Sequence, residues 1–162
     1  MKLILKLFKG IFFTLFVVLC VFNIVLFFST SVLKNSYPNI LGYTYFEVLT
    51  GSMRDEIKER DIVIIKLNSN YNVGDVVTYK TAKSYVTHRI IKIEGNKVIT
   101  KGDANNTEDE PISKEQIIGK VIKVVGSAGI FMRVFTDKVV VVLLFIVVLV
   151  LSYILSLLER EE

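Results

Sequence analysis

The chain has few of the residue types on which enzyme sites are commonly built. Its 162 residues include one cysteine, one histidine, two prolines and no tryptophan. Cys20 lies inside a hydrophobic run, which excludes an intramolecular disulfide, a cysteine-ligated zinc site and an exposed thiol nucleophile. A zinc site at the one imidazole, His88, would need carboxylates alone to complete it. We therefore expect no metal and no cofactor.

The basic residues do not form the kind of surface that binds nucleic acid. Lys and Arg number 20 against 16 Asp and Glu, a net charge of +4. They are scattered through the start and the middle of the chain, without a dense basic block or interleaved aromatic residues. We expect no nucleic-acid partner.

Two long hydrophobic runs, residues 11–28 and 139–158, occupy the two ends of the chain. Each is about as long as a helix that crosses a ~30 Å hydrocarbon core. The roughly 100 residues of the middle segment are too few to bury both runs, so the sequence predicts two membrane spans. A cleavable signal peptide is the alternative for the first run, but the run exceeds the usual apolar middle of a signal peptide, which favours an uncleaved anchor.

The charges before the first run predict the orientation. Lys2, Lys6 and Lys9 precede it with no acidic residue among them, which predicts a cytoplasmic N-terminus. A second span returns the C-terminus to the same side of the plasma membrane. The predicted parts are a cytoplasmic N-terminus with the first span (1–33), an extracytoplasmic domain (34–135), and the second span with a short cytoplasmic tail (136–162).

The segment between the spans has the pattern of a β domain. It is rich in β-branched residues, with turn residues at close intervals. Gly95-Asn96 separates two of its runs, and this pair readily takes the positive φ angles of a tight hairpin. Short strands with frequent turns predict a mainly β fold: an antiparallel, partly closed β domain between two transmembrane helices. The expected strands are 43–50, 61–67, 75–80, 85–94, 97–101 and 117–125.

Ser52 follows the first of these strands in the stretch Thr50-Gly51-Ser52-Met53. A serine hydroxyl becomes a useful nucleophile only when a base takes its proton. Gly51 would let the backbone bend past a bound substrate, and the Ser52 amide and the Thr50 hydroxyl are candidates for an oxyanion hole. The alternative is that Ser52 caps a short helix within residues 53–60, accepting the amide hydrogen of Asp55 or a neighbour.

His88 is the first candidate for the base. A neutral imidazole can accept a serine proton and return it to a leaving amine, although a lone histidine on a strand is also an ordinary structural residue. Asp103 or Asp109, in the acidic loop 101–110, could hold the imidazole tautomer. Such a loop could also bind calcium or simply be solvated, but it lacks the EF-hand pattern.

A lysine base is the other alternative. Lys80 and Lys83 lie in the right part of the chain for a Ser-Lys enzyme. A lysine base must be desolvated to lower its pKa, and neither residue has the apolar neighbours that this requires.

Four motifs in order resemble one known family: Gly51-Ser52-Met53, Gly74-Asp75-Val76-Val77, Thr87-His88-Arg89-Ile90, and Lys101-Gly102-Asp103 with Asp109 beyond it. Together, over about residues 10–125, they resemble the type I signal peptidases of the endoplasmic-reticulum and archaeal branch, which some Gram-positive bacteria also carry. In the common bacterial branch a Lys-Arg pair stands where this chain has His88-Arg89. The family usually places a Pro two residues after Gly-Ser-Met, where this chain has Arg54-Asp55.

The resemblance implies a membrane-bound serine endopeptidase that cleaves N-terminal signal peptides from exported precursors at the outer membrane surface. Ser52 would be the nucleophile, His88 the general base, Asp109 the third member and Asp103 a supporting carboxylate, with Thr50 and the Ser52 amide in the oxyanion hole. Signal peptides and membrane lipid are the expected partners, and no accessory subunit is identified. The alternative is a non-catalytic, membrane-anchored β module that binds exported chains or a partner protein.

Overall fold

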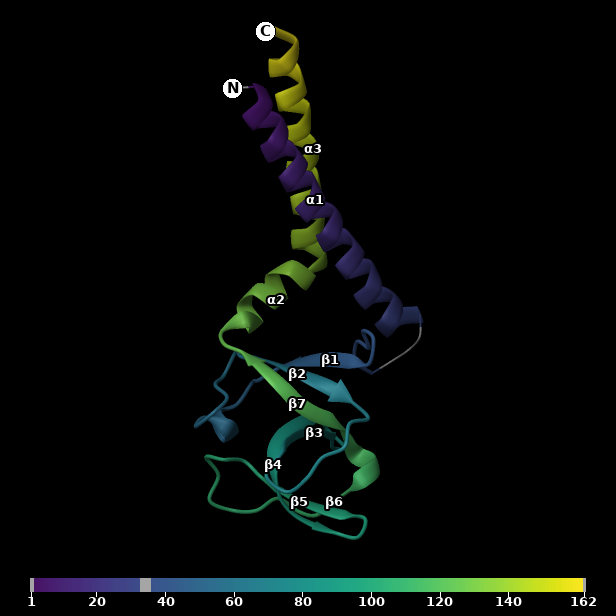
Figure 1. Cartoon of the computed structure of the whole chain (residues 1–162), viewed down its shortest axis with the longest axis vertical. Helices are drawn as coiled ribbons and strands as arrows, with labels where there is room; N and C mark the ends of the chain where they lie inside the picture. Colours follow the sequence, from purple (N-terminus) through teal and green to yellow (C-terminus); the bar gives the residue numbers. More distant parts are fainter. Residues whose placement is uncertain (1, 33–35, 162) are drawn as a thin grey trace. The chain divides into compact units, whose positions relative to one another are not determined.

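The computed structural model describes residues 2–32 and 36–161. The chain divides into two compact units (Figure 1). A helical unit takes in the chain up to residue 34 and from residue 132 onward, and a β unit spans residues 35–131.

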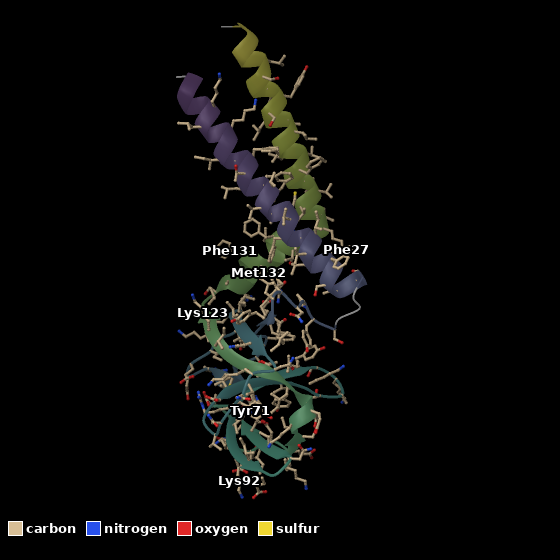
Figure 2. All side chains as sticks on the ribbon, turned by 45° about the vertical axis from the view of Figure 1, so that its right-hand side comes forward. Phe27, Tyr71, Lys92, Lys123, Phe131 and Met132 are labelled. Carbon is tan, nitrogen blue, oxygen red and sulfur yellow. The ribbon has the colours of Figure 1, made fainter. Side chains whose placement is uncertain are left out.

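The helical unit is built from the two hydrophobic runs. Figure 2 shows that the side chains on its helices are mostly carbon, and many of these large apolar side chains are exposed. The α-helices of the described chain are α1 (Lys2–Phe27), continued by a π-helical turn, η1 (Phe28–Val32), then α2 (Ala128–Thr136) and α3 (Lys138–Glu161); two 3₁₀ turns, η2 (Gly51–Met53) and η3 (Lys114–Gln116), lie in the β unit.

Within the described residues, one helix is long and apolar enough to cross a membrane by itself. It covers Lys9–Ser31, with a mean hydropathy of 2.9, and none of its most apolar window is buried by the protein. The rest of the described chain therefore leaves the apolar side chains of this helix uncovered. The second run passes the same test only as a bent pair, α2 with Lys138–Ile154, which turns by 71°. The second predicted span stays a prediction.

The bend before α3 has a local cause. Asp137 Oδ1 accepts the N–H groups of Val139 and Val140, at 2.9 and 3.1 Å, which makes Asp137 the N-cap of α3. Within the same unit, the Asn23 amide of α1 donates to the carbonyl of Phe135 at 3.1 Å. That bond satisfies a carbonyl at the end of α2, where the helical ladder stops.

The β unit is one antiparallel sheet of seven strands. Their spatial order is β1-β2-β7-β3-β4-β5-β6, so β1 and β6 are the two edges and the sheet curls without closing (Figure 1). This confirms the predicted mainly β, antiparallel fold. The strands are β1 (Tyr43–Glu47), β2 (Ile62–Leu67), β3 (Val76–Lys80), β4 (Tyr85–Glu94), β5 (Lys97–Lys101), β6 (Ile112–Ser113) and β7 (Ile117–Val125).

Local signals predicted the β4–β5 hairpin correctly. Glu94 pairs with Lys97 across Gly95-Asn96, and Gly95 has a φ of 58°. One strand was predicted too long, and another was missed. The first strand stops at Glu47 rather than Thr50. The Val48 N–H still donates to the Asp61 carbonyl, but the Val48 carbonyl accepts from the N–H of Arg60, whose φ is 70°, so the regular pairing with β2 ends there. The two-residue strand β6 was not expected at all.

Two clusters of buried side chains form the core of the β unit. The first packs β3, β4, β5 and β6 together and consists of Val77, Tyr79, Ile90, Val98 and Ile112. The second joins β2 to the segment after Ser52 and consists of Met53, Ile57, Val63 and Ile65. Met53 and Ile57 are each only 1% exposed, and burying such a side chain typically contributes about 1.5 to 3 kcal/mol. The turn that carries Ser52 is therefore anchored in the core.

Gly119 offers a test of the sheet. It lies on β7, which pairs with both β2 and β3, and a Cβ at this position would overlap the carbonyl oxygen of Lys66. We predict that Gly119→Ala lowers the free energy of unfolding by about 2 to 3 kcal/mol, because two paired strands must separate to admit a methyl group. Denaturant unfolding of the full chain in detergent measures this. The matched control is Gly126→Ala, whose nearest atom would lie 3.9 Å away; equal stability of the two variants would contradict the account.

Candidate active site

Ser52 lies in a single 3₁₀ turn, η2 (Gly51–Met53). The turn closes without the Pro that the family usually has: the Arg54 N–H donates to the Gly51 carbonyl at 3.1 Å, and the Ile57 N–H to the Met53 carbonyl at 2.7 Å. The Arg54 guanidinium folds back over Gly51, where a Cβ would lie 2.6 Å from Nη2. A side chain at position 51 would therefore displace the Arg54 guanidinium.

The Ser52 side chain does not cap a helix. Thr50 occupies the N-cap position of the turn, without a side-chain cap bond. Ser52 Oγ instead lies 3.0 Å from Nε2 of His88 and 3.4 Å from Oγ1 of Thr50. The serine hydroxyl is thus directed at an imidazole, with a second hydroxyl beside it.

His88 connects Ser52 to Asp109. It sits on β4 opposite Val77 and is 7% exposed. Its Nδ1 lies 2.6 Å from Oδ2 of Asp109. When the neutral ring carries its hydrogen on Nδ1 and donates it to Asp109, Nε2 has a free lone pair toward the Ser52 hydroxyl. The three side chains form one continuous chain of hydrogen bonds.

Two residues that the sequence did not single out hold Asp109. Thr100 Oγ1 donates to Asp109 Oδ2 at 2.7 Å, and the Tyr79 hydroxyl donates to the same oxygen at 3.2 Å. Burial, together with the negative charge of Asp109, raises the pKa of Tyr79 to about 12, so the phenol stays protonated. Tyr79 and Thr100 could have been identified only from the register of β3, β4 and β5, which places them on the same face of the sheet as His88.

Asp103, the other predicted carboxylate, contacts Arg89 and not His88. Arg89 Nε and Nη2 bind its two carboxylate oxygens at 2.9 and 2.7 Å. The same guanidinium donates to Glu56 at 2.7 Å and to the Gly74 carbonyl at 2.8 Å. The hydrogen bonds to Asp103, followed by those to Glu56, raise the pKa of Arg89.

The loop that carries Asp103 is bonded to the backbone of the serine turn. The Ala104 N–H donates to the Ser52 carbonyl at 2.9 Å, and the Asp103 N–H to Met53 Sδ at 3.4 Å. A Cβ on Gly102 would lie 2.7 Å from the Ser52 oxygen, so the close approach depends on glycine. Asp103 therefore acts on Ser52 through the loop, whereas Asp109 contacts the imidazole directly.

The lysine alternative has no such geometry. Lys80 and Lys83 are exposed, and His88 is the residue whose ring nitrogen contacts Ser52 Oγ. Within residues 2–32 and 36–161, no group of three His, Cys, Asp or Glu side chains is placed to hold a metal ion.

Ser52 lines a cleft of about 640 Å³. One wall is the chain that leaves edge strand β1, and the other is the start of β4. The rings of Phe46 and Tyr85 lie 4.8 Å apart, with Tyr37 packed edge-on against both. Asn105, which the sequence had given no role, also lines the cleft. The cleft is thus bordered by extended backbone and aromatic rings.

Substitution of Arg89 tests how much its hydrogen bonds to Asp103, Glu56 and the Gly74 carbonyl stabilise the fold. We predict that Arg89→Lys lowers the free energy of unfolding by about 1 to 3 kcal/mol, because a lysine cannot bind both oxygens of Asp103 while also reaching Glu56 and the Gly74 carbonyl. Thermal unfolding of the full chain measures the loss. Lys92→Arg, in an exposed pair with Glu94, is the control and should be neutral. If Arg89→Lys were as stable as the wild type, the hydrogen bonds of the Arg89 guanidinium would contribute nothing to the stability of the fold.

Comparison with known proteins places the chain among peptidases. A model of the Peptidase S24-like family matches residues 34–122. The chain is 35% identical to Signal peptidase I W of Bacillus subtilis (strain 168) in an alignment 126 residues long, and the alignment covers 72% of this chain and 64% of that protein. It is 27% identical to the Signal peptidase complex catalytic subunit SEC11 of Ogataea parapolymorpha in an alignment 118 residues long, and that alignment covers 57% of this chain and 67% of that protein.

These matches confirm the resemblance to type I signal peptidases, while the matched region spans about two thirds of the length of these two relatives. The family model covers more than half of the chain, and Ser52, His88 and Asp109 all fall inside it. The chain therefore belongs to the Peptidase S24-like family.

Proposed function

We propose that this protein is a membrane-bound serine endopeptidase that removes N-terminal signal peptides from exported precursor proteins. The observation that carries the proposal is the hydrogen-bonded chain Ser52–His88–Asp109, with distances of 3.0 and 2.6 Å, at the wall of a cleft. The similarity to two proteins named as signal peptidases supports the choice of substrate.

In the first half of the reaction, Ser52 Oγ attacks the carbonyl carbon of the scissile peptide bond while His88 Nε2 takes the hydroxyl proton. The oxyanion of the tetrahedral intermediate accepts hydrogen bonds from the Ser52 N–H and the Thr50 hydroxyl. When the intermediate collapses, the C–N bond breaks and the imidazolium gives its proton to the leaving amine. That amine is the new N-terminus of the mature protein.

In the second half, the signal peptide is held on Ser52 as an ester. His88 Nε2 removes a proton from water, and the resulting hydroxide equivalent attacks the ester carbonyl. The C–O bond to Ser52 then breaks, the serine oxygen takes the proton back from His88, and the signal peptide leaves with a free carboxylate. Asp109 stays ionised throughout, fixes the Nδ1–H tautomer and stabilises the imidazolium.

The cleft suits a substrate in extended conformation. β1 is an edge strand, so its backbone groups are available to pair with an added strand. We expect the precursor to pair along residues 45–49 and with the strand that holds Val86, both of which contribute to the cleft walls. The packed rings of Phe46 and Tyr85 narrow the cleft, which favours small side chains at the cut.

The same proposal includes two membrane spans, with both termini in the cytoplasm and residues 34–135 outside it. The apolar helix Lys9–Ser31, the bent pair of α2 and α3, and the lysines at the start of the chain support this topology. It would hold the cleft near the outer membrane surface, where the cleavage site of a translocated precursor emerges.

Single-cysteine labelling tests the topology, since Cys20 is the one cysteine to remove. In a Cys20→Ala background, Lys92→Cys, on the β4–β5 hairpin labelled at Lys92 in Figure 2, should react with a membrane-impermeant maleimide in intact cells. Lys6→Cys should react only after the membrane is permeabilised, because the N-terminus lies inside. Labelling of both sites in the opposite order would contradict the proposed orientation.

The catalytic residues are tested by substitution in the full chain, reconstituted in lipid vesicles with a precursor that carries a signal peptide. Ser52→Ala, His88→Ala and Asp109→Ala should each lower kcat by at least about 10³-fold, because removing one member of such a triad disables proton transfer. Mass spectrometry of the new N-terminus measures cleavage at the correct bond. The matched control is Ser84→Ala, a serine that lines the same cleft, which should retain activity. Undiminished cleavage by Ser52→Ala would contradict the proposal.

The alternative of a non-catalytic β module depended on the altered turn at Arg54-Asp55. The turn closes with these residues and directs Ser52 at His88, so no observation favours this alternative. The non-catalytic alternative would be supported if the wild-type protein bound signal-peptide precursors in vesicles and cut none of them.

A further inference from the structure

The Asp109 carboxylate is bound by more groups than a triad requires. Its Oδ2 atom accepts hydrogen bonds from Thr100 Oγ1 and from the Tyr79 hydroxyl, in addition to the contact of 2.6 Å with His88 Nδ1. Its own backbone N–H donates to the Thr100 carbonyl at 2.8 Å. Thr100 therefore holds Asp109 at both its side chain and its backbone.

The two additional donors lie deep in the sheet. Thr100 is 0% and Tyr79 3% exposed, and the Tyr79 ring belongs to the first core cluster. Tyr79 is on β3, His88 on β4 and Thr100 on β5, and the strand register turns all three side chains to one face. Three neighbouring strands thus bring one imidazole and two hydroxyl groups to one carboxylate oxygen.

The position of these donors has a physical reason. An ionised carboxylate beside an apolar core is costly unless hydrogen-bond donors replace the water that it loses. The Asp109 side chain is 23% exposed, so water reaches it from one side, while Thr100 and Tyr79 bond it from the buried side. Because both bonds end on Oδ2, they also fix which oxygen faces the imidazole.

We propose that Tyr79 and Thr100 are positioning residues, which hold Asp109 with Oδ2 toward His88 Nδ1 and so keep His88 in the tautomer whose Nε2 can accept the Ser52 proton. The catalytic consequence rests on the proposed function. The tautomer itself does not, since it can be measured without a substrate.

The two hydroxyl groups form one network around Asp109 Oδ2, because Thr100 Oγ1 lies 2.7 Å from that oxygen and 3.2 Å from the Tyr79 hydroxyl. The raised pKa of Tyr79, about 12, keeps its phenol protonated wherever the enzyme would work. Valine has nearly the same shape as threonine, and phenylalanine keeps the ring of tyrosine. Tyr79→Phe and Thr100→Val therefore remove the hydrogen bonds with little change in core volume.

The experiment uses the single histidine of the chain. The full-length protein, purified without a histidine tag and labelled with ¹⁵N-histidine, gives one imidazole whose Nδ1 and Nε2 resonances report the tautomer in mildly alkaline solution. We expect the wild type to show the Nδ1–H form. In the double variant Tyr79→Phe/Thr100→Val, the resonances should move toward the mixture of tautomers of a free imidazole.

Kinetics on a signal-peptide precursor provide the second measurement. Each single variant should lower kcat about tenfold, the size of one hydrogen bond to a charged group, and leave KM within about twofold, because neither residue lines the cleft. The matched controls are Thr44→Val, a buried threonine on β1, and Tyr71→Phe, a tyrosine packed against the same core cluster. Both should keep the wild-type tautomer and kcat.

Three results would overturn the inference: a double variant with the wild-type tautomer and kcat, a rise in KM that accounts for the loss of activity, or equal losses in Thr44→Val and Tyr71→Phe. Failure of the proposed function gives a different pattern. If the wild type cut no precursor but lost its Nδ1–H tautomer in the double variant, the positioning role would stand and the substrate assignment would fall.

Discussion

The position of one imidazole is the constraint on which the rest of this structure depends. His88 is the only histidine of the chain, and its ring has to meet Ser52 Oγ with one nitrogen and Asp109 Oδ2 with the other, at 3.0 and 2.6 Å. The ring comes from a paired strand, whereas the serine and the aspartate come from irregular segments. The β unit must therefore hold two loops in place against one strand.

Each of the two loops is held in place by its own set of contacts. The serine turn is held by Met53, whose side chain is buried next to Ile57 and β2. The acidic loop is held by Arg89, which binds both oxygens of Asp103, and it is bonded to the serine turn through the Ala104 N–H. The residues beside Ser52 and His88 in sequence thus keep the two loops together, which explains why the motifs extend beyond the reacting groups.

How much could be predicted from the sequence depended on the range of the interaction. The hairpin at Gly95-Asn96 was predictable because its signal is local. The early end of β1 was not, because it depends on hydrogen bonds between Val48 and the segment around Asp61. Spacing alone could not decide which aspartate meets His88, and Tyr79 and Thr100 enter the site only through the register of three strands.

In the proposed reaction, Ser52 forms a covalent ester with the signal peptide. Acid quenching of the full-length protein within the first turnover of a precursor, followed by mass spectrometry of the intact protein and its fragments, measures this directly. We expect an added mass equal to the signal peptide less one water, located on Ser52 and missing in Ser52→Ala. Cleavage by the wild type with no adduct at any time, together with undiminished cleavage by Ser52→Ala, would contradict it.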